Sequence, residues 1–289
     1  MIHVRSRKIT AAMTLIACLL VAGTALVTGC GQATLRVATT QSLKNSGILN
    51  SVVPAFEKKY KVKVVATAAP TSMAALDAAK RGQADLVLVS SAMAEQEFVK
   101  QGYGVRAVPV MYNDLIVVGP QADPAQIKGL DCPGKSCKKI GTKGAVFVTG
   151  GTGTDVDKKI AMYWDKAGID PKGQGWYVVT GQGIPQTLKV AGQKQGYMII
   201  DRLSFLQNKS GVPLTSLVEG CAMLMNQCDA IMVSPTKLDG KTVDTENAKQ
   251  FITYLTSKTG QDTIGSFKRY NMVMYHPNAE AQSSTPTKM

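Results

Sequence analysis

The chain has 289 residues and a formal net charge of +13, with 45% hydrophobic and 18% charged residues. This length is enough to bury a core in one large domain or in two smaller ones. The lysines and arginines are scattered and lack interleaved aromatic side chains, so a nucleic-acid partner is not indicated. A positive field of this size instead raises the local concentration of anions or favours contact with acidic lipid.

The first thirty residues are predicted to direct export. Three cations, Arg5, Arg7 and Lys8, precede an apolar run that closes on small residues before Cys30. This pattern is typical of a secretory signal peptide over residues 1–29, and LVTGC resembles the bacterial lipobox, in which Cys30 is lipidated. An uncleaved membrane helix is the alternative, but the run is short for a span. We therefore expect an exported lipoprotein, anchored through Cys30 on the periplasmic or cell-surface side of a membrane.

Segments typical of strands and helices alternate through the rest of the chain. Apolar, β-branched runs predict strands at 35–39, 61–68, 84–91, 108–119, 145–150, 176–181, 197–202, 216–220 and 230–235. Apolar residues at helical spacing, often closed by glycine, predict helices at 48–60, 72–82, 92–102, 155–168, 184–196 and 245–267. Repeated strand–helix alternation favours an α/β fold with mainly parallel sheets.

Two strands are expected to cross between two α/β lobes: the long strand around Tyr112–Gly119 and the strand around Ala230–Pro235. The first lobe is then discontinuous in sequence. The predicted divisions are 30–112 with 230–277 for lobe I, 113–229 for lobe II, and 278–289 for a flexible C-terminal tail of low complexity.

Four cysteines of the mature chain form two local pairs. Cys132 and Cys137 flank a Pro-Gly turn, and Cys221 and Cys228 flank the segment AMLMNQ. An oxidising compartment favours two disulfides, although four cysteines allow three connectivities. A zinc site is the rival interpretation, but the spacing is unusual for zinc ribbons and no histidine lies nearby.

Three strand-to-helix junctions carry hydroxyl groups, amides and glycines. They run from Thr39 to Gly47, from Pro70 to Ser72 and from Thr149 to Thr154. In open α/β sheets, ligands bind outside the carboxyl ends of the strands, where helix N-termini offer free N–H donors that attract anions. Each junction taken alone is more typical of ordinary N-capping. Because all three junctions share this chemistry, ligand binding gains support relative to capping, and both interpretations stay open.

Signals for catalysis are weak. The segment GGTGTDVDKK has neither phosphate-loop nor dinucleotide-binding spacing. Asp155 and Asp157 in it suit the positive end of a helix dipole, and Asp201 with Arg202 is expected to form a structural ion pair. With two histidines, both near the chain ends, most histidine-dependent nucleophiles and metal sites are excluded. We expect no enzymatic activity, no cofactor and no cation site.

A set of motifs over residues 35–271 resembles the tungstate-binding proteins of tungstate ABC importers, within the phosphate-binding-like group of periplasmic receptors. The segments that carry the resemblance are ATTQSLKNSG, VVPAFEKKYKVKV, RGQADLVLVSS, VMYNDLIVVGP, DPAQIKG, GQGIPQTLKVA, YMIIDR, LVEG and GQDTIG. The resemblance implies a two-lobed type II periplasmic binding protein fold, with mixed five-stranded sheets joined by two crossover strands.

The resemblance also implies a function. A substrate-binding protein of this kind closes on a tetrahedral oxyanion, tungstate or molybdate first, and delivers it to the membrane permease of an ABC importer. We expect a monomer whose partners are the anion, the permease and, through the lipid, the membrane. The alternatives are a receptor for another small anion or an organic solute, and a sensor or interaction protein with the same fold.

Carried over position by position, the resemblance assigns ligand-binding residues to both lobes. Thr39, Thr40 and Ser42 match the family's first ligand loop, and Ser46 matches the serine that opens its helix. Ser72 stands where the family has the threonine of a Gly-Thr-Gly turn. In the second lobe, Thr152, Gly153 and Thr154 match a Ser-Gly-Thr sequence.

The chain departs from the family pattern at the same loops. Gly150 replaces an arginine, Asp155 a histidine and Gln41 a threonine, while Thr71–Met73 replaces the glycine-flanked turn. A dianion would then be held by neutral donors and helix ends, unless Lys44 swings in. Losing a charge-assisted hydrogen bond costs about 1.5–3 kcal/mol, or roughly ten- to a hundredfold in affinity.

Overall fold

The structure, a computed structural model, describes residues 32–279, which belong to one compact unit. The predicted signal peptide (1–29), the lipidation site Cys30 and residues 280–289 of the predicted tail lie outside the described residues. Among residues 32–279, no helix has the length and apolar character needed to cross a membrane. The described chain alternates strands and helices, as the sequence predicts.

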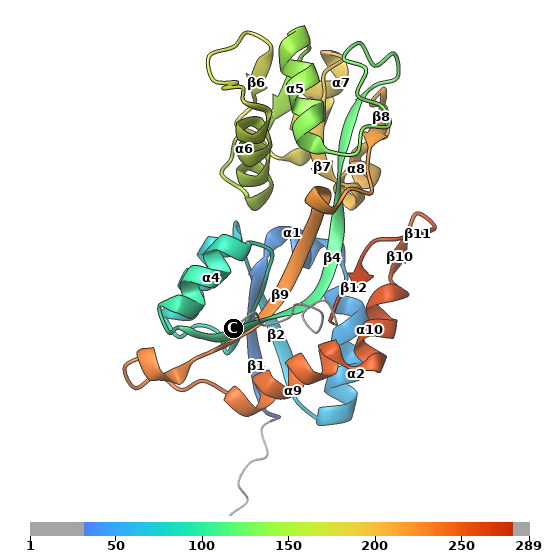
Figure 1. The fold of residues 1–289 in the computed structure, drawn as a ribbon. Coiled ribbons are helices and arrows are strands. Elements are labelled where there is room, and N and C mark those ends of the chain that lie inside the picture. The colour runs from blue at the N-terminus through green and yellow to red at the C-terminus, as the bar shows by residue number, and fades with distance from the viewer. Residues whose placement is uncertain (1–31, 280–289) are drawn as a thin grey trace, which may run out of the picture. The chain divides into compact units, whose positions relative to one another are not determined.

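The sheet of the first lobe combines N-terminal strands with two long strands from later in the chain (Figure 1). From edge to edge it contains β12 (His276–Pro277), β4 (Gly104–Pro120), β9 (Met225–Val233), β3 (Leu86–Val89), β1 (Thr34–Thr40) and β2 (Lys63–Ala69). β1 is parallel to β2 and β3, whereas β9 is antiparallel to β3 and β4. The sheet is therefore mixed, as the family resemblance implied, and not mainly parallel.

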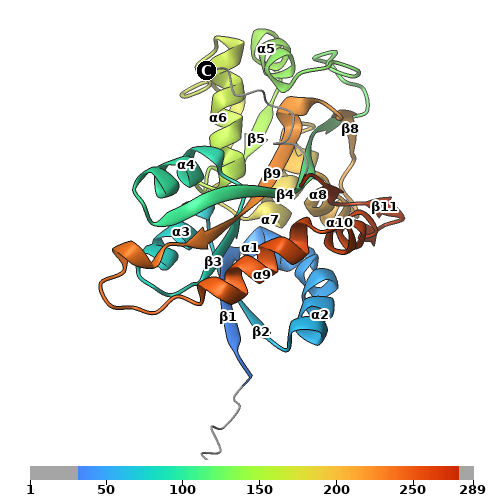
Figure 2. The ribbon, with the colours of Figure 1, turned by 60° about the horizontal axis from the view of Figure 1, so that its bottom comes forward.

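Helices cover both faces of this sheet (Figure 2). The helical elements are α1 (Gln41–Ser46), α2 (Leu49–Tyr60), α3 (Ser72–Lys80), α4 (Ala92–Lys100), η2 (Pro235–Lys237), α9 (Thr245–Thr256) and α10 (Lys258–Gly265). On one face, Phe56 of α2 packs 4.8 Å from Phe251 of α9, measured between ring centroids. On the other face, Leu76 of α3 and Phe98 of α4 are fully buried. A short hairpin, β10 (Lys268–Arg269) and β11 (Met272–Val273), follows α10.

The second lobe is built on the far end of β4. Its elements are α5 (Pro133–Lys143), β5 (Phe147–Thr149), α6 (Asp155–Ala167), β6 (Tyr177–Val179), α7 (Ile184–Gln193), β7 (Met198–Asp201), α8 (Arg202–Asn208), β8 (Leu214–Val218) and η1 (Ala222–Leu224). β7 and β8 pair antiparallel with β4, and β5 is parallel to β6. Trp164 of α6 packs edge-on against Phe147, 5.1 Å between centroids, at the centre of the core.

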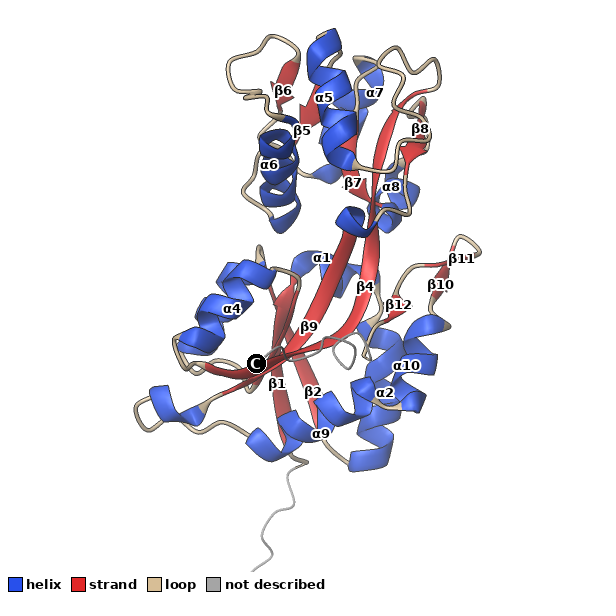
Figure 3. Cartoon of the chain, viewed as in Figure 1, coloured by secondary structure: helices blue, strands red, loops and turns tan. Residues whose placement is uncertain are grey.

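Two strands connect the lobes. The first part of β4, Gly104–Asp114, pairs with β9, and the part from Leu115 onward pairs with β7 and β8. β9 begins at Met225 beside Asp114, five residues before the predicted strand start at Ala230. Figure 3 shows the two paired strands running between two groups of helices. Because β4 pairs with strands of both lobes, this one strand connects the two lobes directly.

The four cysteines of the described chain are free thiols, so neither predicted disulfide is formed in the structure. Cys221 packs against the second-lobe core, whereas Cys228 is buried in the first-lobe core. Cys137 is buried inside α5, and Cys132 is the N-cap of that helix. Their spacing is neither three nor four residues, which are the spacings that bring helical side chains together.

An ion pair between the buried carboxylate of Asp85 and the partly exposed guanidinium of Arg36 stabilises the first-lobe sheet. The Asp85 side chain, in a residue only 1% exposed, accepts hydrogen bonds from the main-chain N, Nε and Nη2 of Arg36 at 2.8, 3.0 and 2.6 Å, and from the main-chain N of Asp244 at 3.0 Å. Burial acts to raise the pKa of Asp85, but the bonds from Arg36 and Asp244 outweigh it, and the pKa lies below its usual value. The pair joins β1 to the approach of β3 and to α9.

We expect Asp85→Ala to lower the free energy of unfolding by about 2–3 kcal/mol, because it leaves a partly buried guanidinium and two main-chain N–H groups without their acceptor. Chemical denaturation at pH 7 measures this. The matched control is Asp131→Ala, which breaks an exposed pair with Lys135 and should leave stability unchanged. Equal stabilities of the two variants would contradict the structural role of Asp85.

Candidate functional site

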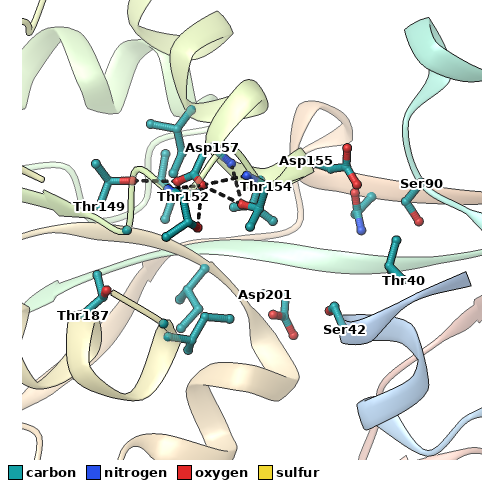
Figure 4. Close-up of a pocket in the computed structure, with 18 of the residues that line it drawn as sticks. Thr40, Ser42, Ser90, Thr149, Thr152, Thr154, Asp155, Asp157, Thr187 and Asp201 are labelled. Carbon is teal, nitrogen blue, oxygen red and sulfur yellow. Dashed lines mark hydrogen bonds between the residues drawn. The ribbon is translucent and has the colours of Figure 1, made fainter. Parts of the chain in front are cut away.

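A cavity of about 210 Å³ opens where strands of both lobes end (Figure 4). Hydroxyl groups line it from several elements: Thr40, Ser42, Ser90, Thr149, Thr152, Thr154 and Thr187. Thr40 ends β1, Ser90 follows β3, and Thr149 ends β5. The cavity therefore lies outside the carboxyl ends of the strands, which is where open α/β sheets bind ligands.

The rest of the lining combines apolar, acidic and neutral amide side chains. The apolar side chains include Leu43, Pro70, Val156, Ile160, Ile184, Met198, Ile199 and Ile200. Three carboxyl groups face the same cavity, those of Asp155, Asp157 and Asp201. Among the described residues that line it, none is a lysine or an arginine. Any negative charge bound here would be met by neutral donors and helix dipoles.

Four of the predicted ligand residues line the cavity: Thr40, Ser42, Thr152 and Thr154. Thr40 is the N-cap of α1, and its Oγ1 accepts from the main-chain N of Leu43 at 3.2 Å. Ser42 is exposed in the first turn of the same helix. The capping and ligand interpretations of this junction are thus compatible, since a capping hydroxyl keeps its own hydrogen for a ligand.

The other four predicted ligand residues lie behind or beside the cavity. Thr39 is buried and donates from Oγ1 to the carbonyl of Leu88 at 2.7 Å. Ser46 is also buried, and its Oγ donates to the carbonyl of Leu43 at 2.7 Å. Gly153 lies in the left-handed region, with φ +76°. In the structure these residues shape the loops.

Ser72 is placed at the start of α3, directly behind Ser90. Its Oγ accepts from the main-chain N of Ser90 at 3.2 Å, while Thr71 caps the helix by accepting from the N of Ala74 at 3.1 Å. The main-chain N of Ser72 donates to Oδ2 of Asp155 at 2.9 Å. This bond brings two predicted ligand loops, one from each lobe, against each other.

Asp157 organises the second-lobe loop. Its two carboxylate oxygens accept hydrogen bonds from the hydroxyls of Thr149, Thr152 and Thr154 and from the main-chain N of Gly151, Thr152 and Thr154, at 2.8–3.3 Å. Burial acts to raise the pKa of Asp157, but these bonds outweigh it and lower the pKa below its usual range. Thr154 returns the contact by accepting from the N of Asp157 at 3.2 Å, which completes a capping box.

The glycine that replaces the family arginine has little room for a side chain. A Cβ added at Gly150 would lie 3.0 Å from the carbonyl oxygen of Gln182. The next residue, Gly151, has φ +64°, and a Cβ there would lie 2.3 Å from Cγ1 of Val179. Lys44 does not supply the missing cation in this structure, because its Nζ donates to the carbonyl of Ala66 at 3.1 Å.

The expected ion pair between Asp201 and Arg202 is not formed. Arg202 pairs instead with Asp114 and Glu219, each at 2.9 Å. Asp201 is the N-cap of α8 and accepts from the main-chain N of Ser204 at 2.9 Å, with its side chain at the cavity. Burial raises the pKa of Asp201 above its usual value.

Several lining residues escaped the sequence analysis: Ser90, Asn113, Gln182, Thr187, Asn226 and Tyr275. Ser90, Asn113, Gln182 and Thr187 lie inside segments that carry the family resemblance, but no motif in those segments singles them out as ligand contacts. A signal did exist for Ser90, because it follows the buried run Leu86–Val89 as Thr40 ends β1. Asn113 and Asn226 sit on paired strands β4 and β9, and only their pairing brings them together.

A buried acidic pair lies close to the cavity wall formed by Ser90. Glu95, only 2% exposed, accepts at Oε1 from the main-chain N of Ser91 at 2.6 Å. Burial, with the charge of Asp229 as the next cause, raises the pKa of Glu95 to about 8. Lys159 of α6 is the nearby cation, with Nζ donating to the carbonyl of Met225 at 3.0 Å. Burial and the neighbouring carboxyl of Asp229 therefore both favour the neutral form of Glu95.

Comparison with known proteins finds relatives over most of the chain. Residues 27–259 match the PBP superfamily domain. The tungstate-binding protein TupA of Peptoclostridium acidaminophilum is 36% identical over 248 residues, which cover 84% of this chain and 85% of that protein. The solved structure of TupA from Desulfovibrio alaskensis has a TM-score of 0.81 at 35% identity, covering 86% of this chain and 100% of that one. The tungstate ABC transporter structure from Geobacter sulfurreducens has a TM-score of 0.70 at 35% identity, covering 81% and 98%.

Proposed function

The chain belongs to the PBP superfamily, in the family of tungstate-binding proteins, and we propose on that premise that it is the receptor of an ABC importer for a tetrahedral oxyanion. Tungstate and molybdate are the first candidates. The periplasmic-binding-protein fold implied by the sequence is confirmed by the structural relatives. The observation that carries the proposal is the cavity lined by hydroxyls of both lobes at the starts of α1 and α6.

The proposed ligand contacts are neutral. Thr40 and Ser42 would donate hydroxyl hydrogens from the first lobe, and the first N–H groups of α6 would donate from the second, since these groups have no partner within the helix. Closure around the anion is favoured only by the difference in affinity between closed and open states. Delivery to the permease follows when the lobes reopen.

Calorimetric titration with tungstate, molybdate, phosphate and sulfate tests the proposal. We expect binding of tungstate or molybdate ahead of the other two. The absence of both heat and thermal shift for all four anions would refute an oxyanion receptor. The conditions should include low ionic strength, because screening weakens the attraction between anions and helix ends.

Ser42→Ala tests the first-lobe contacts with little risk to the fold, because Ser42 is exposed at the cavity edge. We expect tungstate affinity to fall about ten- to a hundredfold, as one hydrogen bond to a charged ligand is lost. The thermal midpoint without ligand should not change. Ser210→Ala, at an exposed loop residue outside the cavity lining, is the control. Equal affinities for both variants would remove Ser42 from the site.

A second candidate function rests on the charges of the cavity. Three carboxyl groups and an apolar wall suit a small organic solute that carries hydrogen-bond donors better than they suit a bare dianion. Mass spectrometry of small molecules released from the freshly purified, denatured protein separates the two. Recovery of an organic solute in stoichiometric amount, with no bound tungsten or molybdenum, would favour this second candidate.

We also propose that Cys30 carries a lipid anchor. Only three residues separate it from β1, which starts at Thr34. β1 runs from there to Thr40 at the cavity, about 20 Å at 3.3 Å per residue. Cys30→Ser should release the protein from the membrane fraction of expressing cells.

We also propose that the two lobes divide at 112/113 and 229/230, each inside a crossover strand.

A further inference from the structure

Asp155 makes an unusual contact for the first residue of a helix. Its Oδ2 accepts from the main-chain N of Ser72 at 2.9 Å, across a sequence separation of 83 residues and from the opposite lobe. Figure 4 shows Asp155 on the side of Ser90, apart from the hydrogen bonds that surround Asp157. An acidic side chain in the first turn of a helix interacts favourably with the dipole of that helix without any contact to the other lobe. The bond to Ser72 is therefore an additional interaction.

The partner of Asp155 is an anion-attracting group. Ser72 is the first residue of the nine-residue helix α3, whose N–H groups point out without partners in the helix. Ser72 is also one of the residues that the family resemblance assigns to the ligand. Asp155 lines the cavity, whereas Ser72 is buried behind it, so the carboxylate stands between the cavity and the first-lobe amide donor.

The carboxylate is only partly satisfied there. The Asp155 side chain is 14% exposed, and its Oδ1 is buried without a hydrogen bond. Nζ of Lys158 lies 3.6 Å from Oδ1 on a half-exposed side chain, and Lys159 also interacts electrostatically with Asp155. Asp157, two residues on, has six donors on its two oxygens by contrast. A weakly satisfied carboxylate can be replaced by a better acceptor.

We propose that Asp155 is a tethered internal anion, which holds the start of α3 in the ligand-free protein and is displaced when the ligand binds. The inference rests on the proposed function for the identity of the ligand, but not for the contact itself. An anion in the cavity and the Asp155 carboxylate repel each other and compete for the same N–H donor behind the cavity wall, and no lysine or arginine among the described residues lines the cavity to offset this, so Asp155 lowers anion affinity. It also links the lobes before ligand arrives. Once displaced, its carboxylate can pair fully with Lys158.

The first test measures tungstate affinity of the mature protein by calorimetry. Asp155→Asn removes the charge and Asp155→Ala removes the acceptor as well; both should bind at least tenfold more tightly than the unsubstituted protein. Asp165→Asn, at an exposed position on the same helix, makes the same change of net charge and should stay within twofold. Unchanged or weaker binding by both Asp155 variants would overturn the proposal.

The second test needs no ligand. Amide hydrogen exchange of the Ser72 N–H should be at least tenfold faster in Asp155→Ala than in the unsubstituted protein or in Asp165→Asn, since the acceptor is lost. Equal exchange in all three proteins would overturn the proposal. If no protein binds any of the four oxyanions, the proposed function fails, and the exchange rates alone still decide the role of Asp155.

Discussion

Replacing Asp157 by alanine is expected to lower the free energy of unfolding by about 3–4 kcal/mol and to abolish ligand binding. Three hydroxyls and three main-chain N–H groups lose their acceptor together, and the capping box of α6 loses one half. A lost cap alone costs about 1 kcal/mol, and the hydroxyl of buried Thr149 without its acceptor adds about 1–3 kcal/mol. Asp157→Asn keeps one acceptor oxygen and should lose less stability.

The stability contributed by Asp157 is expected to depend on pH. The pKa of Asp157 is lowered in the folded protein, so its ionised form contributes stability above the unfolded pKa, and that stability is lost as pH falls through the folded pKa. Denaturation curves between pH 3 and 7 should therefore converge for the unsubstituted protein and Asp157→Asn in acid. Asp165→Asn should run parallel to the unsubstituted protein. A constant gap between the Asp157→Asn and unsubstituted curves would contradict the role of the carboxylate charge.

Local signals in the sequence were sufficient for the elements that position the site. α3 and α4 end at Lys80 and Lys100, two residues before the glycines that predicted their ends. The predicted helix 245–267 is instead two helices, because Ser257 is extended and caps α10 by accepting from the N of Gly260. A Cβ at Gly260 would lie 2.1 Å from the carbonyl oxygen of Tyr254, so this sharp connection requires glycine.

The contacts within the site were harder to predict, because most join residues that are distant in sequence. The N-caps Thr40, Thr71 and Thr154 were foreseeable from strand-to-helix junctions, as their partners are three residues away. Asp155 was read as a dipole partner of its own helix, whereas it contacts Ser72. Asp157 has a local signal, because it stands three residues after Thr154 and completes its capping box. The contact of Asp155 has no local signal, since Ser72 is 83 residues away on the other lobe.

Glu95→Gln is expected to make the protein more stable than the unsubstituted form at alkaline pH, with the difference growing between pH 5 and pH 8. The folded protein holds the Glu95 proton up to a pKa of about 8, while the unfolded chain releases it near the usual value of 4.5. Stability therefore falls as pH rises through this window, by up to about 4 kcal/mol. Glutamine is neutral throughout, and its amide oxygen can still accept from the N of Ser91.

Chemical denaturation at pH 5.5, 7 and 8.5 measures the effect, with Glu97→Gln as control, because Glu97 is exposed on the same helix. The profile of the control should follow that of the unsubstituted protein, while Glu95→Gln should lose the decline that Glu95 causes. Parallel profiles for all three would show that Glu95 is ionised in the folded state. Glu95 lies beside Asp229 and close to Lys159 of the opposite lobe. An ionised Glu95 would attract Lys159, so alkaline pH should also strengthen the contact between the lobes.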